Sequence, residues 1–180
     1  MDTRTPYREL ENKIPADPGL YAVFVDSSAK LRETTIANHP LDYPIYVGKS
    51  QVGLQVRHLE EHFAAGRTGS STVRRSFAAL LRTALDLNPI RRGSTGRDQD
   101  FVSYKLDQAS EERLSGWMTS HLEIGWRAFT GPANQLKRQE VALIGHFQPP
   151  LNLQHSSHPA VAEVKSLRAQ RATLARDATD

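Results

Sequence analysis

The chain has 180 residues, a hydrophobic fraction of 38%, a charged fraction of 24% and a formal net charge of +3. These values are typical of a globular domain and exclude a chain that is disordered throughout. The absence of cysteine excludes disulfide bonds, thiolate metal sites and cysteine nucleophiles. The longest apolar run, Leu20 to Val25, is far shorter than the ~18 residues of a membrane span, and no apolar leader follows the first charges, so we expect a cytoplasmic protein without membrane contact.

The first half of the chain is predicted to form two strands followed by two helices. Residues 19–25 (GLYAVFV) are apolar on both faces, which is typical of a central strand. Residues 45–47 form a second short strand, which pairs with the first as a hairpin with a long loop. Apolar residues at helical spacing predict one helix over 54–63 and another from residue 72, with serine and threonine N-cap candidates at 70–72.

The second half adds strands, helices and a polar end. Residues 88–99 are rich in proline and glycine and are predicted to form a loop. The further elements are strands over 101–106 and 122–129 and helices over 110–120 and 133–147. These elements favour an α+β fold with a small, mainly antiparallel three-stranded sheet flanked by helices. We expect the domain to span residues 1–152 and residues 153–180 to form a polar tail in which a surface helix can form.

The predicted helix over 133–147 carries a carboxylate on its apolar face. Its apolar stripe consists of Leu136, Leu143, Ile144 and Phe147. Glu140 occupies the remaining position of this stripe, one turn after the first of these residues. Because an unpaired buried charge costs several kcal/mol, such a carboxylate is normally paired with a cation or bound to a metal. Both a buried salt bridge and a metal site fit this position.

Positive charge is concentrated in one segment. Residues 57–97 contain eight arginines and three acidic residues, which is a net charge of +5. A surface of this kind suits contact with phosphate groups, although solvated helix faces with similar charge are at least as common. Arg74, Arg75 and Arg82 are the candidates for binding nucleic acid.

Five short motifs follow one another in a fixed order along the chain. They are GLY at 19–21, YVG at 46–48, Arg57, Glu140 and PPLN at 149–152. In this order they resemble the GIY-YIG nuclease family, with leucine and valine in place of the two isoleucines. The resemblance implies neighbouring strands that carry the two tyrosines, an arginine on the first helix, a metal-binding glutamate and an asparagine shortly after it.

The resemblance also implies an activity and a cofactor. It implies a divalent-metal-dependent endonuclease that hydrolyses phosphodiester bonds, in DNA rather than RNA, with Mg²⁺ or Mn²⁺. Glu140 would hold the metal, and Arg57 would bind the phosphate with two donors. Tyr46 or Tyr21 would act as the general base.

Three further residues complete the site that the resemblance implies. Lys49 would favour the phenolate of a tyrosine, whose ordinary pKa is about 10. The family places a histidine or tyrosine about one helical turn after the arginine, and His62 is our candidate, with His58 and Glu61 as alternatives. Asn152 supplies the final asparagine.

Two other functions fit parts of the sequence. His58, Glu61 and His62 match the H-x-x-E-H pattern of inverted zinc metallopeptidases. A catalytically inactive nucleic-acid-binding module of the same fold would need only the basic segment. The metallopeptidase leaves both tyrosine motifs without a role, and the inactive module has no need of Glu140, so we favour the nuclease.

Overall fold

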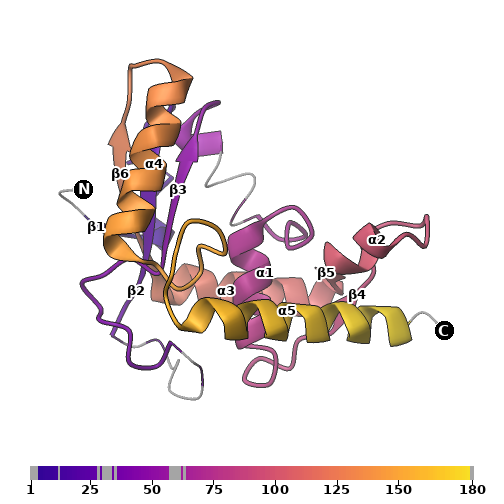
Figure 1. Ribbon diagram of the computed structural model, residues 1–180. Coiled ribbons are helices and arrows are strands. Elements are labelled where there is room, and N and C mark those ends of the chain that lie inside the picture. The colour runs from indigo at the N-terminus through magenta and orange to yellow at the C-terminus, as the bar shows by residue number, and fades with distance from the viewer. Residues whose placement is uncertain are drawn as a thin grey trace.

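A computed structural model describes residues 4–11, 13–27, 29, 34, 36–56, 62 and 64–178 (Figure 1). Within these residues the chain forms an α+β fold, as predicted, around one antiparallel sheet of four strands. The spatial order of its strands is β1 (Arg4–Pro6), β6 (Leu122–Ala128), β2 (Gly19–Val25) and β3 (Tyr46–Ser50). The other elements are a 3-10 helix (Tyr7–Glu9), α1 (Thr72–Leu80), β4 (Pro89–Ile90), α2 (Asp98–Val102), β5 (Lys105–Leu106), α3 (Gln108–His121), α4 (Ala133–Phe147) and α5 (Ala160–Asp177).

β2 is the central strand, as its two apolar faces predicted. It pairs antiparallel with β3 on one side and with β6 on the other, and all of its residues are buried. Tyr21, Val23 and Val25 face the larger hydrophobic cluster, which the sheet shares with α1, α3 and α5. Ala22 and Phe24 face a smaller cluster that α4 covers. The two apolar faces therefore bury against different helices.

The predicted boundaries differ from the structure where elements are short. Residues 101–106 were predicted as one strand, but 98–102 form α2 and only the last two residues form β5. β5 pairs with β4, which lies in the segment predicted as a loop. β1 makes the sheet four-stranded rather than three-stranded, and its three residues are too few for an alternating pattern to be recognised.

α5 occupies most of the segment that was expected to be a polar tail. The helix packs against α1, α2 and β4 (Figure 1). Its buried residues are alanines and valines: Ala160, Val161, Val164, Ala172 and Ala175. All of them except Val161 belong to the main core cluster. The segment therefore packs on the body of the fold and is more than a surface helix. Neither α5 nor any other helix in the described part of the chain has the length and apolar character to cross a membrane.

Arg74, which was expected on a nucleic-acid-binding surface, is fully buried. Its Nη2 atom lies 2.7 Å from Oε2 of Glu111, which is also buried. The guanidinium also donates to Thr68 Oγ1, to Ser115 Oγ and to the carbonyl oxygen of His62. Burial lowers the pKa of Arg74, and the neighbouring Glu111 carboxylate opposes that change. Arg74 therefore belongs to the core and does not reach a phosphate outside it.

Replacing Arg74 should destabilise the fold strongly. We expect Arg74→Gln to lower the free energy of unfolding by about 3–5 kcal/mol, because it leaves the Glu111 carboxylate buried without its cation. Urea denaturation at constant pH measures this change. The control is Arg138→Gln, which removes an exposed arginine from α4 and should change the value by no more than about 0.5 kcal/mol. Equal effects of the two substitutions would contradict a structural role for Arg74.

Candidate active site

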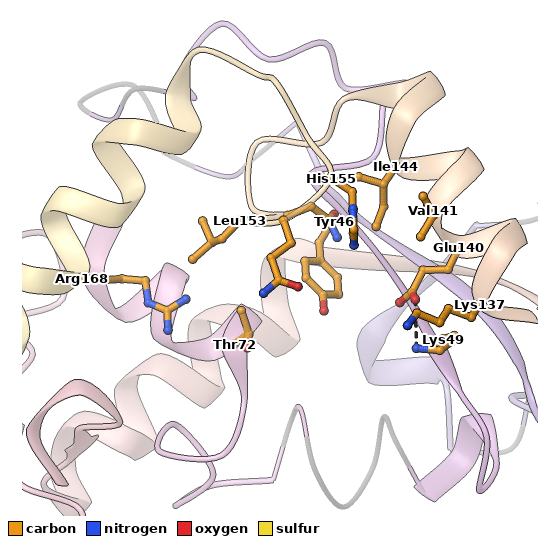
Figure 2. A pocket seen from close by; sticks show the side chains of 12 residues that line it. Tyr46, Lys49, Thr72, Lys137, Glu140, Val141, Ile144, Leu153, His155 and Arg168 are labelled. Atoms are coloured by element: carbon orange, nitrogen blue, oxygen red, sulfur yellow. Dashed lines mark ion pairs between the residues drawn. The ribbon is translucent and has the colours of Figure 1, made fainter. Parts of the chain in front are cut away.

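A cleft of about 490 Å³ lies beside the edge strand β3 (Figure 2). Its walls come from β3, from α4 and the segment that follows it, from the first residue of α1, and from α5. The side chains that line it include those of Tyr46, Lys49, Thr72, Glu140, Asn152 and Arg168. Four of these were predicted as site residues from the sequence, from positions more than a hundred residues apart. The fold therefore brings these four residues, which come from both halves of the chain, to one cleft.

The cleft receives side chains from both faces of β3. Tyr46 packs with the larger core cluster, whereas Val47 packs with the cluster under α4. Alternation along the strand places Lys49 on the same face as Val47. Because β3 is at the edge of the sheet, groups from the two faces can meet around that edge.

Glu140 is paired with Lys49 at the side of the cleft. Their Oε2 and Nζ atoms are 3.0 Å apart, and the side chains are 18% and 24% exposed. Ile144 follows Glu140 by one turn and is buried against the sheet, so α4 turns the carboxylate toward β3. Glu140 is thus paired with a cation, which is Lys49. From the sequence we expected Lys49 to act on a tyrosine.

The residues of the cleft fit a divalent metal ion with one protein carboxylate. Among the described residues, no group of three or more His, Asp or Glu side chains could hold a metal together. Mg²⁺ commonly uses one or two carboxylates and fills its octahedron with water and phosphate oxygens, and Mn²⁺ prefers the same donors. Glu140 in an open cleft offers this arrangement.

Three buried side chains form a hydrogen-bonded chain next to the cleft. Tyr21 Oη lies 2.5 Å from His62 Nε2, and His62 Nδ1 lies 2.8 Å from Ser71 Oγ. Ser71 is also the N-cap of α1, because its Oγ accepts the N–H of Arg74. Tyr21 and His62 are 0% and 1% exposed, so each fixes the orientation of the other away from solvent. The predicted site residue His62 therefore supports a tyrosine.

Tyr46 connects this buried chain with the cleft. The centroid of its ring lies 6.1 Å from that of Tyr21 and 6.4 Å from that of His62. Its side chain is partly exposed, and Figure 2 shows its hydroxyl between Thr72 and Glu140. Of the two tyrosines in the predicted site, Tyr46 is the one that a ligand in the cleft can touch.

Gly48, the last residue of the YVG motif, provides space for the Tyr21 side chain. The two residues are cross-strand partners between β2 and β3. A Cβ atom at position 48 would lie 2.5 Å from both Cζ and Oη of Tyr21. The glycine is therefore required by the close approach of a neighbouring ring within the sheet.

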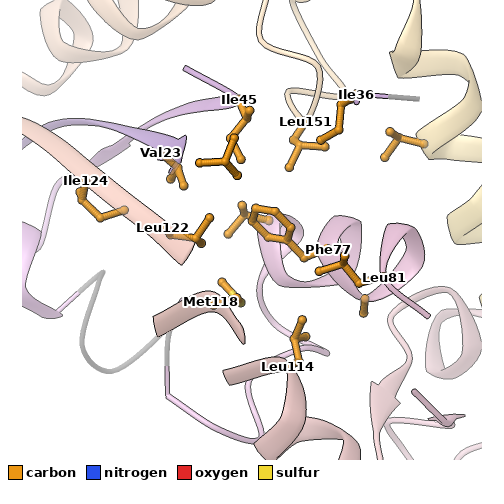
Figure 3. Close-up of a cluster of buried hydrophobic side chains, with 14 of the residues drawn as sticks. Val23, Ile36, Ile45, Phe77, Leu81, Leu114, Met118, Leu122, Ile124 and Leu151 are labelled. Atoms are coloured by element: carbon orange, nitrogen blue, oxygen red, sulfur yellow. The ribbon is translucent and has the colours of Figure 1, made fainter. Parts of the chain in front are cut away.

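Asn152 connects the segment after α4 to the free edge of β3 through two hydrogen bonds. Its Oδ1 accepts the N–H of Val47 and its Nδ2 donates to the carbonyl of the same residue, each at 2.8 Å. Leu151, which is buried in the main core (Figure 3), donates its N–H to the carbonyl of Ile45 at 3.0 Å. The PPLN motif thus continues the hydrogen bonding of the sheet and holds the strand that carries Tyr46. Asn152 is a positioning residue in this geometry.

Several predicted residues lie elsewhere or outside the described residues. Arg57, His58 and Glu61 are outside them, and their roles stay predictions. Arg75 on α1 and Arg82 just after α1 are partly buried and do not line the cleft.

The contacts of His62 bear on the zinc metallopeptidase alternative. Both of its ring nitrogens are already hydrogen-bonded, one to Tyr21 and one to Ser71. A zinc ligand needs one ring nitrogen for the metal. The observed geometry therefore leaves His62 unsuited to the H-x-x-E-H role.

Arg168 lines the cleft and was not identified from the sequence. It comes from α5, and in Figure 2 its guanidinium points toward Thr72 across from Glu140. No motif marks this residue. The sequence offered only a weak indication, which is that Arg168 and Arg171 are three positions apart and share one face of a helix.

The need for a glycine at position 48 can be tested by adding one methyl group. We expect Gly48→Ala to lower the free energy of unfolding by about 1–3 kcal/mol, because the Tyr21 ring must move. Urea denaturation measures the loss, and the ¹⁵N shifts of the His62 ring report its contact with Tyr21.

The matched control for this substitution is Gly145→Ala. Gly145 is exposed on α4, and a Cβ there would meet no described atom within 4 Å. Alanine should be neutral there or stabilise the helix by about 0.5–1 kcal/mol. Unchanged stability and unchanged His62 shifts in Gly48→Ala would show that the Tyr21 ring can accommodate the added methyl group.

Comparison with known proteins identifies the family of the chain. A family model described as the GIY-YIG catalytic domain matches residues 19–172. No curated protein and no solved structure is significantly similar to the chain. The family match includes both tyrosine strands, α4, the PPLN segment and most of α5. The chain therefore belongs to the GIY-YIG family, whose catalytic domain is that of a nuclease.

Proposed function

We propose that the protein is an endonuclease that hydrolyses phosphodiester bonds in DNA with the help of Mg²⁺ or Mn²⁺. The observation that supports this most directly is the convergence of Tyr46, Lys49 and Glu140 in one open cleft. A hydroxyl that can act as a base, a carboxylate that can hold a metal and a cation that attracts phosphate are the groups that this reaction requires. Membership of the GIY-YIG family supports the same chemistry.

Tyr46 is the general base in this proposal. Its hydroxyl reaches the cleft, whereas Tyr21 is buried and bonded to His62. A phenol with a pKa near 10 needs nearby positive charge to act as a base at neutral pH. The charge of Arg168 interacts favourably with a Tyr46 phenolate and takes the role that we expected of Lys49.

Glu140 and Lys49 prepare the opposite side of the cleft. Lys49 holds the Glu140 carboxylate in place and adds positive charge where a phosphate would enter. A divalent ion bound to Glu140 would polarise the phosphoryl group and stabilise the leaving oxygen. The buried chain of Tyr21, His62 and Ser71 keeps the rings beside Tyr46 from moving.

Removing the carboxylate should abolish cleavage. We expect Glu140→Gln to reduce cleavage of supercoiled and branched DNA with Mg²⁺ or Mn²⁺ by at least about a hundredfold, because the neutral amide lacks the negative charge that holds a divalent ion at a site with one carboxylate. Glu163→Gln removes an exposed carboxylate of α5 and should cleave like the wild type. Equal cleavage by the two variants would refute the metal role of Glu140. DNA binding without cleavage by the wild type would favour the inactive binding module.

The role of Tyr46 can be tested separately. Tyr46→Phe should lower the single-turnover cleavage rate by about 10²–10⁴, which is the usual effect of losing a general base. Tyr43→Phe is the control, because Tyr43 is 45% exposed and does not line the cleft. A rate for Tyr46→Phe within a few fold of the control would assign the base to another group.

A further inference from the structure

A cluster of arginines from α1, α5 and the segments that follow α1 and β4 begins at the cleft. We use the term arginine cluster for Arg75, Arg82, Arg92, Arg168 and Arg171. Arg168 lines the cleft, and Arg171 follows it by nearly one turn of α5. Arg75 on α1 is close enough to Arg168 and Arg92 for their charges to repel. The cluster therefore extends from the cleft along the contact between the two helices.

Within the part of the chain that the structure describes, no carboxylate pairs with the arginine cluster. Arg75 and Arg92 both donate to the carbonyl oxygen of Gly69, which carries no full charge. Tyr104, which lies among Arg75, Arg168 and Arg171, is a neutral phenol because burial raises its pKa to about 12. Among the described residues, the positive charges of the cluster thus lie together without a paired negative charge.

Burial increases the unfavourable energy of this arrangement. Four of the guanidinium groups have a buried nitrogen with no hydrogen-bond partner in the described structure: Arg75 Nε, Arg82 Nε, Arg168 Nη1 and Arg171 Nε. A buried donor of this kind has given up its hydrogen bond to water without gaining one from the protein, which is unfavourable. Burial, with Arg168 and Arg92, lowers the pKa of Arg75 to about 10. A cluster of this kind is unfavourable for folding alone, and a bound anion would relieve its repulsion.

The position of the arginine cluster indicates which anion it binds. Arg168 faces the same cleft as Glu140 and Tyr46, so an anion there is part of the ligand that fills the cleft. α1 begins at the cleft with Thr72, and the N-terminus of a helix adds positive potential. A guanidinium group matches the oxygens of a phosphate with two donors at once.

We propose that Arg168, supported by Arg75 and Arg171, forms a second phosphate-binding site. It binds a phosphate of the nucleic-acid backbone other than the one that lies at Glu140. This inference rests on the proposed nuclease function for the identity of the ligand. It assigns to α5 a direct role in holding the substrate. Glu140 acts on the bond that breaks, and Arg168 fixes the direction in which the strand crosses the cleft.

The test is the affinity for a short fluorescently labelled DNA duplex in EDTA, measured by anisotropy at several KCl concentrations. We expect Arg168→Gln to weaken binding about tenfold and to reduce the slope of log K against log salt by about 1, as for one lost phosphate contact. Arg168→Lys should retain the slope but only part of the affinity. The control Lys165→Gln removes the same charge from an exposed position on α5 and should bind within about twofold of the wild type.

The outcomes separate this site from the proposed function. Glu140→Gln should keep the metal-free affinity of the wild type while it loses cleavage. Equal salt slopes and affinities for Arg168→Gln and Lys165→Gln would overturn the phosphate site, as would the absence of metal-free binding by the wild type. If Glu140→Gln still cleaves DNA but Arg168→Gln weakens binding as expected, the phosphate site stands and the metal role of Glu140 fails. Thermal unfolding of each variant shows that the comparison is between folded proteins.

Discussion

The register between β2 and β3 determines where the groups of the cleft lie. It places Tyr21 opposite Gly48, and with it Tyr46 on the same face of the sheet. A slip of one residue would exchange the faces of β3 and turn Tyr46 toward α4. Asn152 opposes such a slip from the other edge, because both of its polar atoms are bonded to Val47. The GLY, YVG and PPLN motifs therefore act together to fix the position of β3.

The electrostatics of the cleft follow from this constraint. The carboxylate of Glu140 is held by Lys49 on one side, and the arginine cluster supplies further positive charge on the other. A polyanion that enters such a cleft replaces repulsion between cations with attraction to phosphate. In our proposal stability and binding are linked, since a phosphate backbone would supply acceptors to guanidinium groups that have a buried nitrogen without a partner in the described structure.

Long, periodic segments made much of the fold predictable from the sequence. The helix 133–147 was predicted with its observed bounds, and the position of Glu140 on its inner face followed from the same spacing. Short elements were not predictable, because β1, β4 and β5 contain too few residues for a period to appear. Arg74 was misread because charge counts do not reveal a partner, and Glu111 lies 37 positions away. Arg168 was missed because its alanine-rich surroundings resemble a tail, and only tertiary packing shows that these alanines are buried.

The packing of α5 also changes how similarity within this family should be judged. A fragment that stops after the asparagine motif would contain all five motifs and would still lack the wall of the cleft that Arg168 provides. Two proteins can thus agree in every motif residue while differing in the helix that closes the far side of the cleft. Such differences offer a physical way for related catalytic domains to bind nucleic acids of different shape while they catalyse the same reaction.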